Sequence, residues 1–393
     1  MDVMTENKVV PTLRFKLKGE EWFYNKIGDI CIVKTGGRDT QDRKESGKHP
    51  FFVRSNTVKK IDSFSFDGEA ILTSGDGVGV GKNFHYINDK FDYHQRVYAL
   101  HTFKEGFLGK FIFQVFKQKF YRRVMRLSAK NSVDSVRMSM ITDMEMAFPS
   151  LPEQQKIASF LSAVDEKIQQ LTKKKDLLEE YKKGVMQQIF SQELRFKDDN
   201  GNDYPDWEEK KLREVLFEHK LKSTGKEEVY SVSVHKGLIN QIEHLGRSFS
   251  AKNTDHYNLV KANDIIYTKS PTGQFPYGII KQAKINKDVI VSPLYAVFTP
   301  ESEHLGYILD IHFESKHNVH NYLHSIIQKG AKNTINITNS TFLSKSFKLP
   351  IDFDEQRKIG SFLKSIDSKK ELVSTQIEKT KAFKKGLLQQ MFV

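Results

Sequence analysis

The chain has 393 residues and a formal net charge of +13, from 62 Lys and Arg against 49 Asp and Glu. Its one cysteine, Cys31, excludes a disulfide framework and a cysteine-rich zinc site. No apolar run approaches the ~18 residues of a membrane span, and no signal-peptide pattern opens the chain, so we expect a cytoplasmic protein with no membrane partner. The basic balance favours a polyanionic partner, nucleic acid first.

The sequence after Trp22 predicts a first α+β domain, and the segment around Trp22 is its first element. Short alternating runs bounded by Gly, Asp and Asn predict strands, among them 68–74 and 95–100. The segment 107–123 is aromatic and basic at helical spacing, and its phenylalanines favour a core role over base stacking. These features together predict a mixed domain of strands and at least one helix.

The glycine-rich run 75–82 follows the first of these strands. A Walker A loop needs Gly where Asp76 stands, and Ser or Thr where Asn83 stands. We therefore reject nucleotide binding, and we interpret the run as a mobile loop that can approach DNA closely.

The stretch 153–190 occurs twice, because 355–392 repeats it without a gap at an offset of 202 positions, the distance from Glu153 to Glu355. A fixed offset over that length indicates a duplication. The polar, Gly- and Pro-bearing segment 196–205 links the copies. After it, 263–269 and 292–297 correspond to the two strands named above, so the repeating unit is an α+β domain followed by a long helix.

Apolar residues in both copies of this helix fall seven apart. A strict seven-residue repeat indicates a left-handed coiled coil, and such a narrow seam on a polar helix is not stable alone. Each helix could lie on its own domain, or the two copies could pack on each other as an antiparallel pair related by a two-fold axis. Lys174, Lys175, Lys182 and Lys384 interrupt the seam, which favours parts of it facing another protein. The predicted seam residues are Ile157, Leu161, Val164, Ile168, Leu171, Leu178, Val185, Ile359, Leu363, Ile366, Val373 and Leu387.

Catalytic motifs are not found. The Asp/Asn-Pro-Pro-aromatic motif of amino-methyltransferases is missing, and the 13 histidines show no His-Glu-x-x-His spacing. We predict no catalytic residue and no metal site.

The entry to each repeated helix carries a family resemblance. Leu151-Pro152-Glu153-Gln154 leads to Ile157, and Leu349-Pro350 leads to Glu355-Gln356 and Ile359, with 351–354 inserted in the second copy. The arrangement, over nearly the whole chain, resembles the specificity subunit of type I restriction–modification enzymes.

The resemblance implies an α+β architecture with pseudo-two-fold, circular organisation. Residues 1–150 would form target recognition domain 1, 151–195 the first conserved helix, 196–348 target recognition domain 2 and 349–393 the second helix. The two helices would form an antiparallel coiled coil between the domains. Each domain would bind one half of an asymmetric, bipartite site on double-stranded DNA, and the coiled coil would set the spacer.

The resemblance also implies partners. Two methyltransferase subunits would dock on the helices, and motor–nuclease subunits would join through them, directing adenine methylation and restriction as a host defence in a bacterium or archaeon. This chain would be non-catalytic and hold no cofactor, because S-adenosylmethionine, ATP and Mg²⁺ belong to the partners. Two alternatives stay open: an interaction scaffold with no DNA role, and a self-contained restriction–methylation enzyme.

Phosphate contacts need Lys or Arg, and base contacts need Arg, Lys, Asn, Gln, Ser or Thr on protruding loops. The family has no fixed motif in its recognition domains, so these candidates rest on residue type and position alone. The DNA-binding candidates are Arg54, Ser55, Asn56, Thr73, Ser74, Lys82, Gln95, Arg96, His235, Lys236, Lys269, Ser270, Thr272, Gln274 and Ser292.

Overall fold

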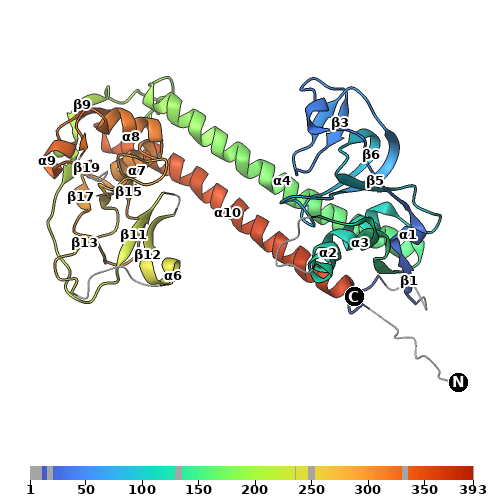
Figure 1. The fold of residues 1–393 in the computed structure, drawn as a ribbon. Coiled ribbons are helices and arrows are strands. Elements are labelled where there is room, and N and C mark those ends of the chain that lie inside the picture. Colours follow the sequence, from blue (N-terminus) through green and yellow to red (C-terminus); the bar gives the residue numbers. More distant parts are fainter. Residues whose placement is uncertain are drawn as a thin grey trace. The chain divides into compact units, whose positions relative to one another are not determined.

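The structure is a computed structural model that describes residues 11–15, 21–128, 135–234, 236–246, 253–329 and 335–392. It divides into two compact units, residues 1–174 with 373–393, and residues 175–372. Two long helices, α4 (Leu151–Phe190) and α10 (Phe353–Met391), each contribute one end to each unit (Figure 1). Among the described residues, no helix combines the length and the apolar character that crossing a membrane requires.

The first unit is built on a six-stranded sheet with β5 and β6 at its centre. Strands are found at both predicted ranges, 68–74 and 95–100, and these two strands, β5 and β7, pair antiparallel with Ile71 opposite Leu100. The sheet order is β2 (Ile32–Thr35), β7 (Val97–His101), β5 (Phe66–Ser74), β6 (Phe84–Tyr93), β3 (His49–Phe52) and β4 (Lys59–Ile61). A separate antiparallel pair joins β1 (Phe23–Lys26) to β8 (Glu145–Phe148).

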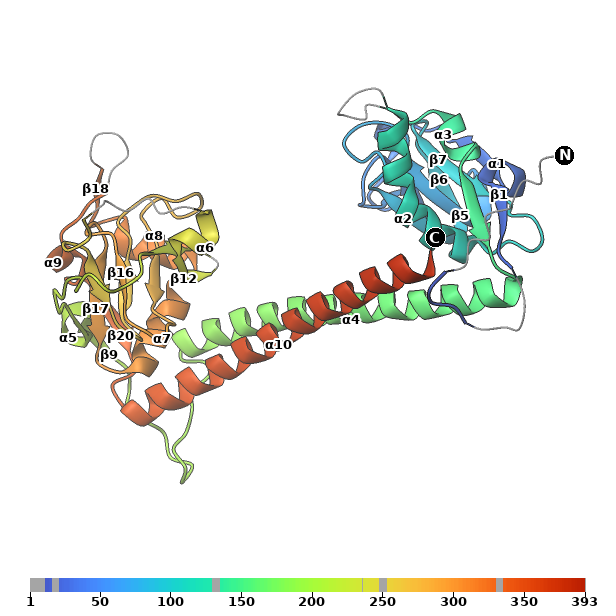
Figure 2. The same cartoon turned by 90° about the horizontal axis from the view of Figure 1, so that it is seen from below.

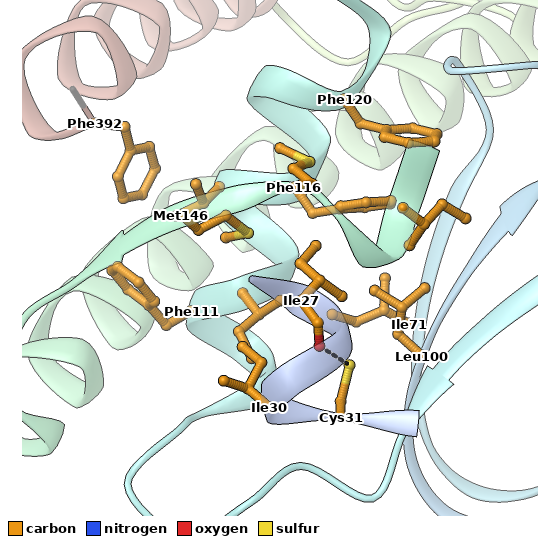
Figure 3. Close-up of a cluster of buried hydrophobic side chains, with 14 of the residues drawn as sticks. Ile27, Ile30, Cys31, Ile71, Leu100, Phe111, Phe116, Phe120, Met146 and Phe392 are labelled. Carbon is orange, nitrogen blue, oxygen red and sulfur yellow. Dashed lines mark hydrogen bonds between the residues drawn. The ribbon is translucent and has the colours of Figure 1, made fainter. Parts of the chain in front are cut away.

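Helix α2 (Gly109–Leu127) packs on this sheet and confirms the helix predicted from 107–123. Phe111, Phe116 and Phe120 are fully buried in a core shared with Ile71 and Leu100, so the core role predicted for them is correct (Figure 3). The remaining helical turns of the domain are α1 (Ile27–Ile30), η1 (Thr40–Asp42) and α3 (Met138–Thr142).

The second unit repeats the plan with shorter strands. Its sheet pairs β14 (Ile265–Tyr267) antiparallel with β17 (Ala296–Pro300), Ile266 opposite Val297, and β17 lies beside helix α7 (Glu303–His312) of this domain in Figure 2. Strand β14 lies inside the predicted 263–269. Strand β17 overlaps the predicted 292–297 only at Ala296 and Val297, because 292–295 form a turn before it. Strands β10 (Leu216–Phe217) and β15 (Ile280–Gln282) flank them. The other pairs are β9 (Glu208–Lys211) with β20 (Ser346–Leu349), β11 (Tyr230–Ser233) with β12 (Gly237–Asn240), β13 (Asn258–Val260) with β16 (Val289–Val291), and β18 (Gln328–Lys329) with β19 (Ile335–Asn336).

Where the first domain has the single helix α2 after its sheet strands, the second domain has two shorter helices. Helix α7 (Glu303–His312) ends, and α8 (Lys316–Leu323) begins after Ser315, whose hydroxyl accepts from the Asn318 amide as an N-cap. The short helices α5 (Leu212–Val215), α6 (Gln241–Leu245) and α9 (Asn339–Phe342) complete the domain. The two domains therefore share their anchoring strands and differ in the elements between them.

Candidate nucleic-acid interface and the helices that carry it

Each half of the helix pair is buried both by the other helix and by a domain. In the first unit, Ile157 and Leu161 of α4 share a core with Leu387 and Met391 of α10 and with Phe111 of α2. The second unit has an equivalent cluster, composed of Val185, Ile189, Ile308, Ile359, Leu363 and Ile366 with their neighbours. Both of the arrangements considered from sequence are thus realised at once. Of the twelve predicted seam residues, all are buried except Ile168 and Leu178, which are half-buried.

Two ion pairs at repeat-equivalent positions join the helices. In the first unit the Lys384 ammonium lies 2.6 Å from Oδ1 of Asp165, and in the second unit Lys182 lies 2.8 Å from Oδ1 of Asp367. Asp165 corresponds to Asp367 under the repeat, and Lys182 to Lys384. An antiparallel pairing therefore matches opposite charges in both units, whereas a parallel pairing of the copies would oppose like charges. Our expectation that these two lysines face another protein is wrong, because each ends in an intramolecular ion pair.

The domains add contacts to both aspartates. The Gln114 side-chain amide of α2 donates to Asp165 at 3.3 Å, and the Tyr307 hydroxyl of α7 donates to Asp367. Burial alone would raise the pKa of Asp367, but hydrogen bonds from Lys182 and Tyr307 outweigh it and hold that pKa below its usual value. Each aspartate therefore lies on one long helix and contacts both the other long helix and the adjoining domain.

The Glu-Gln sequence that opens each repeat attaches the helix to its domain. The Gln154 side chain is buried, donates to the carbonyls of Gly106 and Pro149 at 2.9 Å, and accepts from the Leu108 amide at 3.0 Å. In the second unit the Gln356 amide donates to the Pro350 carbonyl at 3.0 Å. These glutamines hold loop carbonyls that would otherwise be buried without partners.

The preceding glutamates are buried against arginines. Glu153 receives both Nε and Nη2 of Arg14, at 3.1 and 2.6 Å, a bidentate pair. Its equivalent Glu355 lies 3.4 Å from Nη2 of Arg195, and burial raises the pKa of Glu355. Arg14 and Arg195 both precede the first strand of their domains, so the sequence motif has a structural explanation.

In the first domain, the structure brings Arg54 and Arg96 together around one carboxylate. Arg54 Nη1 lies 2.9 Å from Asp76 Oδ1, and Arg96 Nε lies 3.8 Å from Asp76 Oδ2. Gln95 is exposed and donates to Asp39 at 3.1 Å, and Lys82 lies 5.8 Å from the centre of the Tyr121 ring. Ser55 is half-buried and Asn56 is exposed. Whether these residues contact DNA stays a prediction.

Thr73 and Ser74 are corrections to the candidate set. They are 1% and 2% exposed, because the end of β5 is covered on both faces. Their side chains are therefore not available to DNA in this structure.

Two of the glycines after β5, Gly79 and Gly81, are required by packing. A Cβ on Gly79 would lie 2.1 Å from the Asn83 amide nitrogen, and one on Gly81 would lie 2.9 Å from the Tyr121 ring. Gly81 also has a φ of +63°. Close approach within the domain, rather than to a ligand, explains these two glycines.

The second-domain candidates occupy three loops. Lys269 is half-buried, its ammonium donates to Asn339, and burial lowers its pKa. Ser270 follows it, and a tight loop closed by Thr272 and Phe275 presents exposed Gln274. Lys236 is exposed, and the half-buried Ser292 hydroxyl accepts from the Leu294 amide at 3.3 Å. His235 lies outside the described residues.

One basic surface lies outside the set of DNA-binding candidates, although the sequence shows that 107–123 is basic. Helix α2 carries basic side chains and no acidic one, and Lys119, Arg122 and Arg126 line an open cavity of about 480 Å³. None of these three forms an ion pair with a described residue, while Arg123 beside them donates to the Met140 and Asp143 carbonyls. The absence of Asp and Glu from this segment, which contains several Lys and Arg, could have indicated the basic surface from the sequence.

The fold and the paired anchors define a protein with two different α+β domains mounted on an internally duplicated helix pair. The family model described as the type I restriction modification DNA specificity domain matches residues 19–180 and again 204–382. The chain belongs to this family, as the sequence resemblance predicted, and the expected fold class is confirmed.

Similar proteins agree with this assignment. The chain is 25% identical over 180 residues to the type I restriction enzyme EcoDI specificity subunit of Escherichia coli, a match covering 44% of this chain and 39% of the relative. It is 23% identical over 305 residues to the MjaIX specificity subunit of Methanocaldococcus jannaschii, covering 68% and 69%. The matched region thus spans about two fifths of the first relative's length. The crystal structure of a type I restriction–modification S subunit from M. genitalium shares the fold, with a TM-score of 0.66 at 16% identity, covering 98% and 99% of the two chains.

Proposed function

We propose that the chain is the non-catalytic DNA-specificity subunit of a type I restriction–modification complex, in which each domain binds one half of an asymmetric, bipartite target. The observation that carries this proposal is the duplication of the anchoring contacts without duplication of the domain surfaces. Asp165–Lys384 and Asp367–Lys182 repeat the same ion pair, while the loops of the two domains differ in sequence and structure. Two different DNA-binding domains carried by one repeated helix pair suit a DNA target with two unlike halves.

The first domain's surface chemistry supports phosphate contact. Arg54 and Arg96 are exposed around Asp76, and α2 contributes Lys119 and Arg122 to a basic cavity. Cations of this kind attract a polyanion and position it, while exposed loop residues such as Asn56 read base edges.

The helix pair supports a fixed spacer between the two half-sites. Its register is held in each unit by a buried apolar cluster and by the ion pair described above. The length of the two helices, at ~1.5 Å per residue, then determines the length of the spacer between the half-sites. Two methyltransferase subunits would dock on the repeated helices, joined by motor–nuclease subunits, and these partners would supply S-adenosylmethionine, ATP and Mg²⁺ chemistry.

DNA binding at graded salt tests the proposal against the interaction-scaffold alternative. The complex with its methyltransferase subunits should bind target duplex with an affinity that falls steeply with salt, with a slope of about 0.9 per phosphate contacted. Arg54→Ala with Arg96→Ala should weaken binding and reduce this slope, whereas Lys26→Ala, exposed on β1, should change neither. Salt-independent or undetectable DNA binding would favour the scaffold.

The self-contained enzyme is tested separately. Methyl transfer from S-adenosylmethionine to target DNA by the isolated chain would establish it and contradict the proposal.

A further inference from the structure

The first domain holds one exposed arginine on a backbone that is fixed on both sides. Arg96 lies in the tight turn between β6 and β7. Its amide donates to Nδ1 of the buried His94 at 2.9 Å, and its carbonyl accepts from the Gly75 amide at 2.7 Å. Burial lowers the pKa of His94, and the nearby Arg54 adds to this effect, so Nδ1 keeps the lone pair that accepts from Arg96. Both peptide groups of Arg96 are therefore held in place.

The residues around this turn bring a carboxylate beside the arginine. A Cβ on Gly75 would lie 2.9 Å from the Arg96 carbonyl oxygen, so only glycine lets the two loops approach this closely. Asp76 follows Gly75, and its Oδ2 lies 3.8 Å from Arg96 Nε. Its Oδ1 accepts from Arg54 Nη1 at 2.9 Å. Arg54 thus orients the carboxylate, and the carboxylate restrains the Arg96 side chain.

The two side chains present hydrogen-bond donors beside an acceptor. The Arg96 side chain is 67% exposed and that of Asp76 is 24% exposed. The ion pair uses Nε of Arg96, and its terminal nitrogens Nη1 and Nη2 contact no residue that the structure describes. A carboxylate has more acceptor positions than these two arginines occupy. A fork of donors and a free acceptor therefore lie next to each other at the end of the sheet.

This pattern matches the major-groove edge of a G·C base pair. Guanine offers two acceptors there, O6 and N7, and its paired cytosine offers the N4 amino group as a donor. An A·T pair has the adenine N6 donor where guanine has O6, and this donor would oppose the donors of Arg96. A phosphate is negatively charged and carries only acceptors, so Asp76 would repel it. The carboxylate therefore favours a base edge over the DNA backbone as the partner of Arg96.

We propose that Arg96 and Asp76 together recognise one G·C pair in the first half-site. The terminal nitrogens of Arg96 donate to O6 and N7 of guanine, and the Asp76 carboxylate accepts from N4 of the paired cytosine. Arg54 is a positioning residue that orients the carboxylate. This inference rests on the proposed function and names a base pair that the first domain recognises.

A position-specific loss of affinity tests this inference. The complex of the chain with its methyltransferase subunit is titrated with duplexes that carry the target found by methylome sequencing, with each base pair of the first half-site exchanged in turn. At one position the unaltered complex should prefer G·C to A·T by about 5- to 150-fold. Arg96→Ala should abolish this preference and leave the preferences in the second half-site unchanged. Lys26→Ala, which removes a cation exposed on β1, should keep both.

7-Deazaguanine at that position tests the guanine acceptor directly, because it still pairs with cytosine but has a C–H group in place of N7. It should weaken binding by the unaltered complex about fivefold or more. It should not weaken binding by the Arg96→Ala complex further.

Replacing the carboxylate gives a second, opposite signature. Asp76→Asn should reduce the preference for G·C and raise the affinity for unrelated duplex, because the charge that repels phosphate is lost. Asp29→Asn, on the exposed side of α1, makes the same change in net charge and should do neither. Unchanged recognition of the second half-site by each variant shows that the chain is folded.

Two results would overturn the inference and leave the proposed function intact. One is an equal loss of affinity for all sequences with Arg96→Ala, which would make Arg96 a phosphate contact. The other is a first half-site without a preferred G·C pair. An unaltered complex that binds no duplex in preference to unrelated DNA would remove the proposed function as well.

Discussion

Replacing Lys182 with methionine tests how the ion pairs hold the helices. Methionine keeps the apolar stem and removes the charge that lies 2.8 Å from Asp367 and 3.3 Å from Glu314. Removing one partner of a buried pair costs about 3–5 kcal/mol. Because the Asp367 and Glu314 side chains are 27% and 39% exposed, solvent relieves part of that cost, and we expect a loss of about 2–3 kcal/mol.

Lys384→Met is the internal comparison. Only Asp165 loses its charged partner there, while it keeps the hydrogen bond from Gln114, and its side chain is 40% exposed, so we expect a smaller loss of about 1–2 kcal/mol. Urea unfolding of each variant gives the free energies. Adding Asp367→Asn to Lys182→Met should recover part of the loss, since it removes one unpaired charge.

The effect of Lys182→Met should depend on pH in a defined sense. Burial alone would raise the pKa values of Asp367 and Glu314, but Lys182 and other partners hold both below their usual values. Their contribution to stability is present above the unfolded-state pKa values, near 4, and is lost as pH falls through the folded-state values. The difference between the variant and the unaltered chain should therefore shrink below about pH 4. Equal losses for Lys182→Met and Lys384→Met, or a difference independent of pH, would refute the reasoning.

Three further predictions concern single residues. Burial raises the pKa of the Cys31 thiol to about 12, so iodoacetamide at pH 8 should label Cys31 only in urea, and rapid native labelling would contradict its burial. Gly81→Ala should cost about 1–2 kcal/mol from backbone strain, plus the cost of the clash with Tyr121. The loss of stability should be larger than for Gly77→Ala, since Gly77 also has a positive φ, +75°, but open space around it. Equal losses for the two variants in thermal unfolding would show that the contact with Tyr121 contributes nothing. Gln154→Ala removes the side-chain partner of three backbone groups, the buried Pro149 carbonyl and the half-buried Gly106 carbonyl and Leu108 amide, and should cost about 2–3 kcal/mol. Gln155→Ala, exposed beside it, should stay within about 0.5 kcal/mol, and a small loss for Gln154→Ala in urea unfolding would refute the anchoring role.

The repeat and the strands that anchor it could be predicted from the sequence, because both leave periodic signals. A heptad pattern marked Ile157 and Leu387 for burial, and matched runs located β5 and β14. The role of Lys182 and Lys384 could not be predicted in this way. A lysine in a seam is compatible with a foreign interface or with an internal partner, and only the antiparallel register shows that Asp367 and Asp165 stand opposite.

The candidate DNA surface was the least predictable part. Residues were chosen by type and by their position near loops, which does not reveal the direction of a side chain. Ala70–Ser74 are all buried, so β5 lacks the alternation that would have separated Thr73 and Ser74 from exposed neighbours. Conversely, the basic face of α2 lies on a helix and was outside a search confined to loops.

The most direct test of the central claim is methylome sequencing of cells that express this chain with its methyltransferase subunit. The account predicts adenine methylation at one bipartite, asymmetric motif, with one half changing when the first domain is exchanged and the other when the second is exchanged. Methylation at a single undivided motif, or no methylation from a complex that assembles, would contradict it.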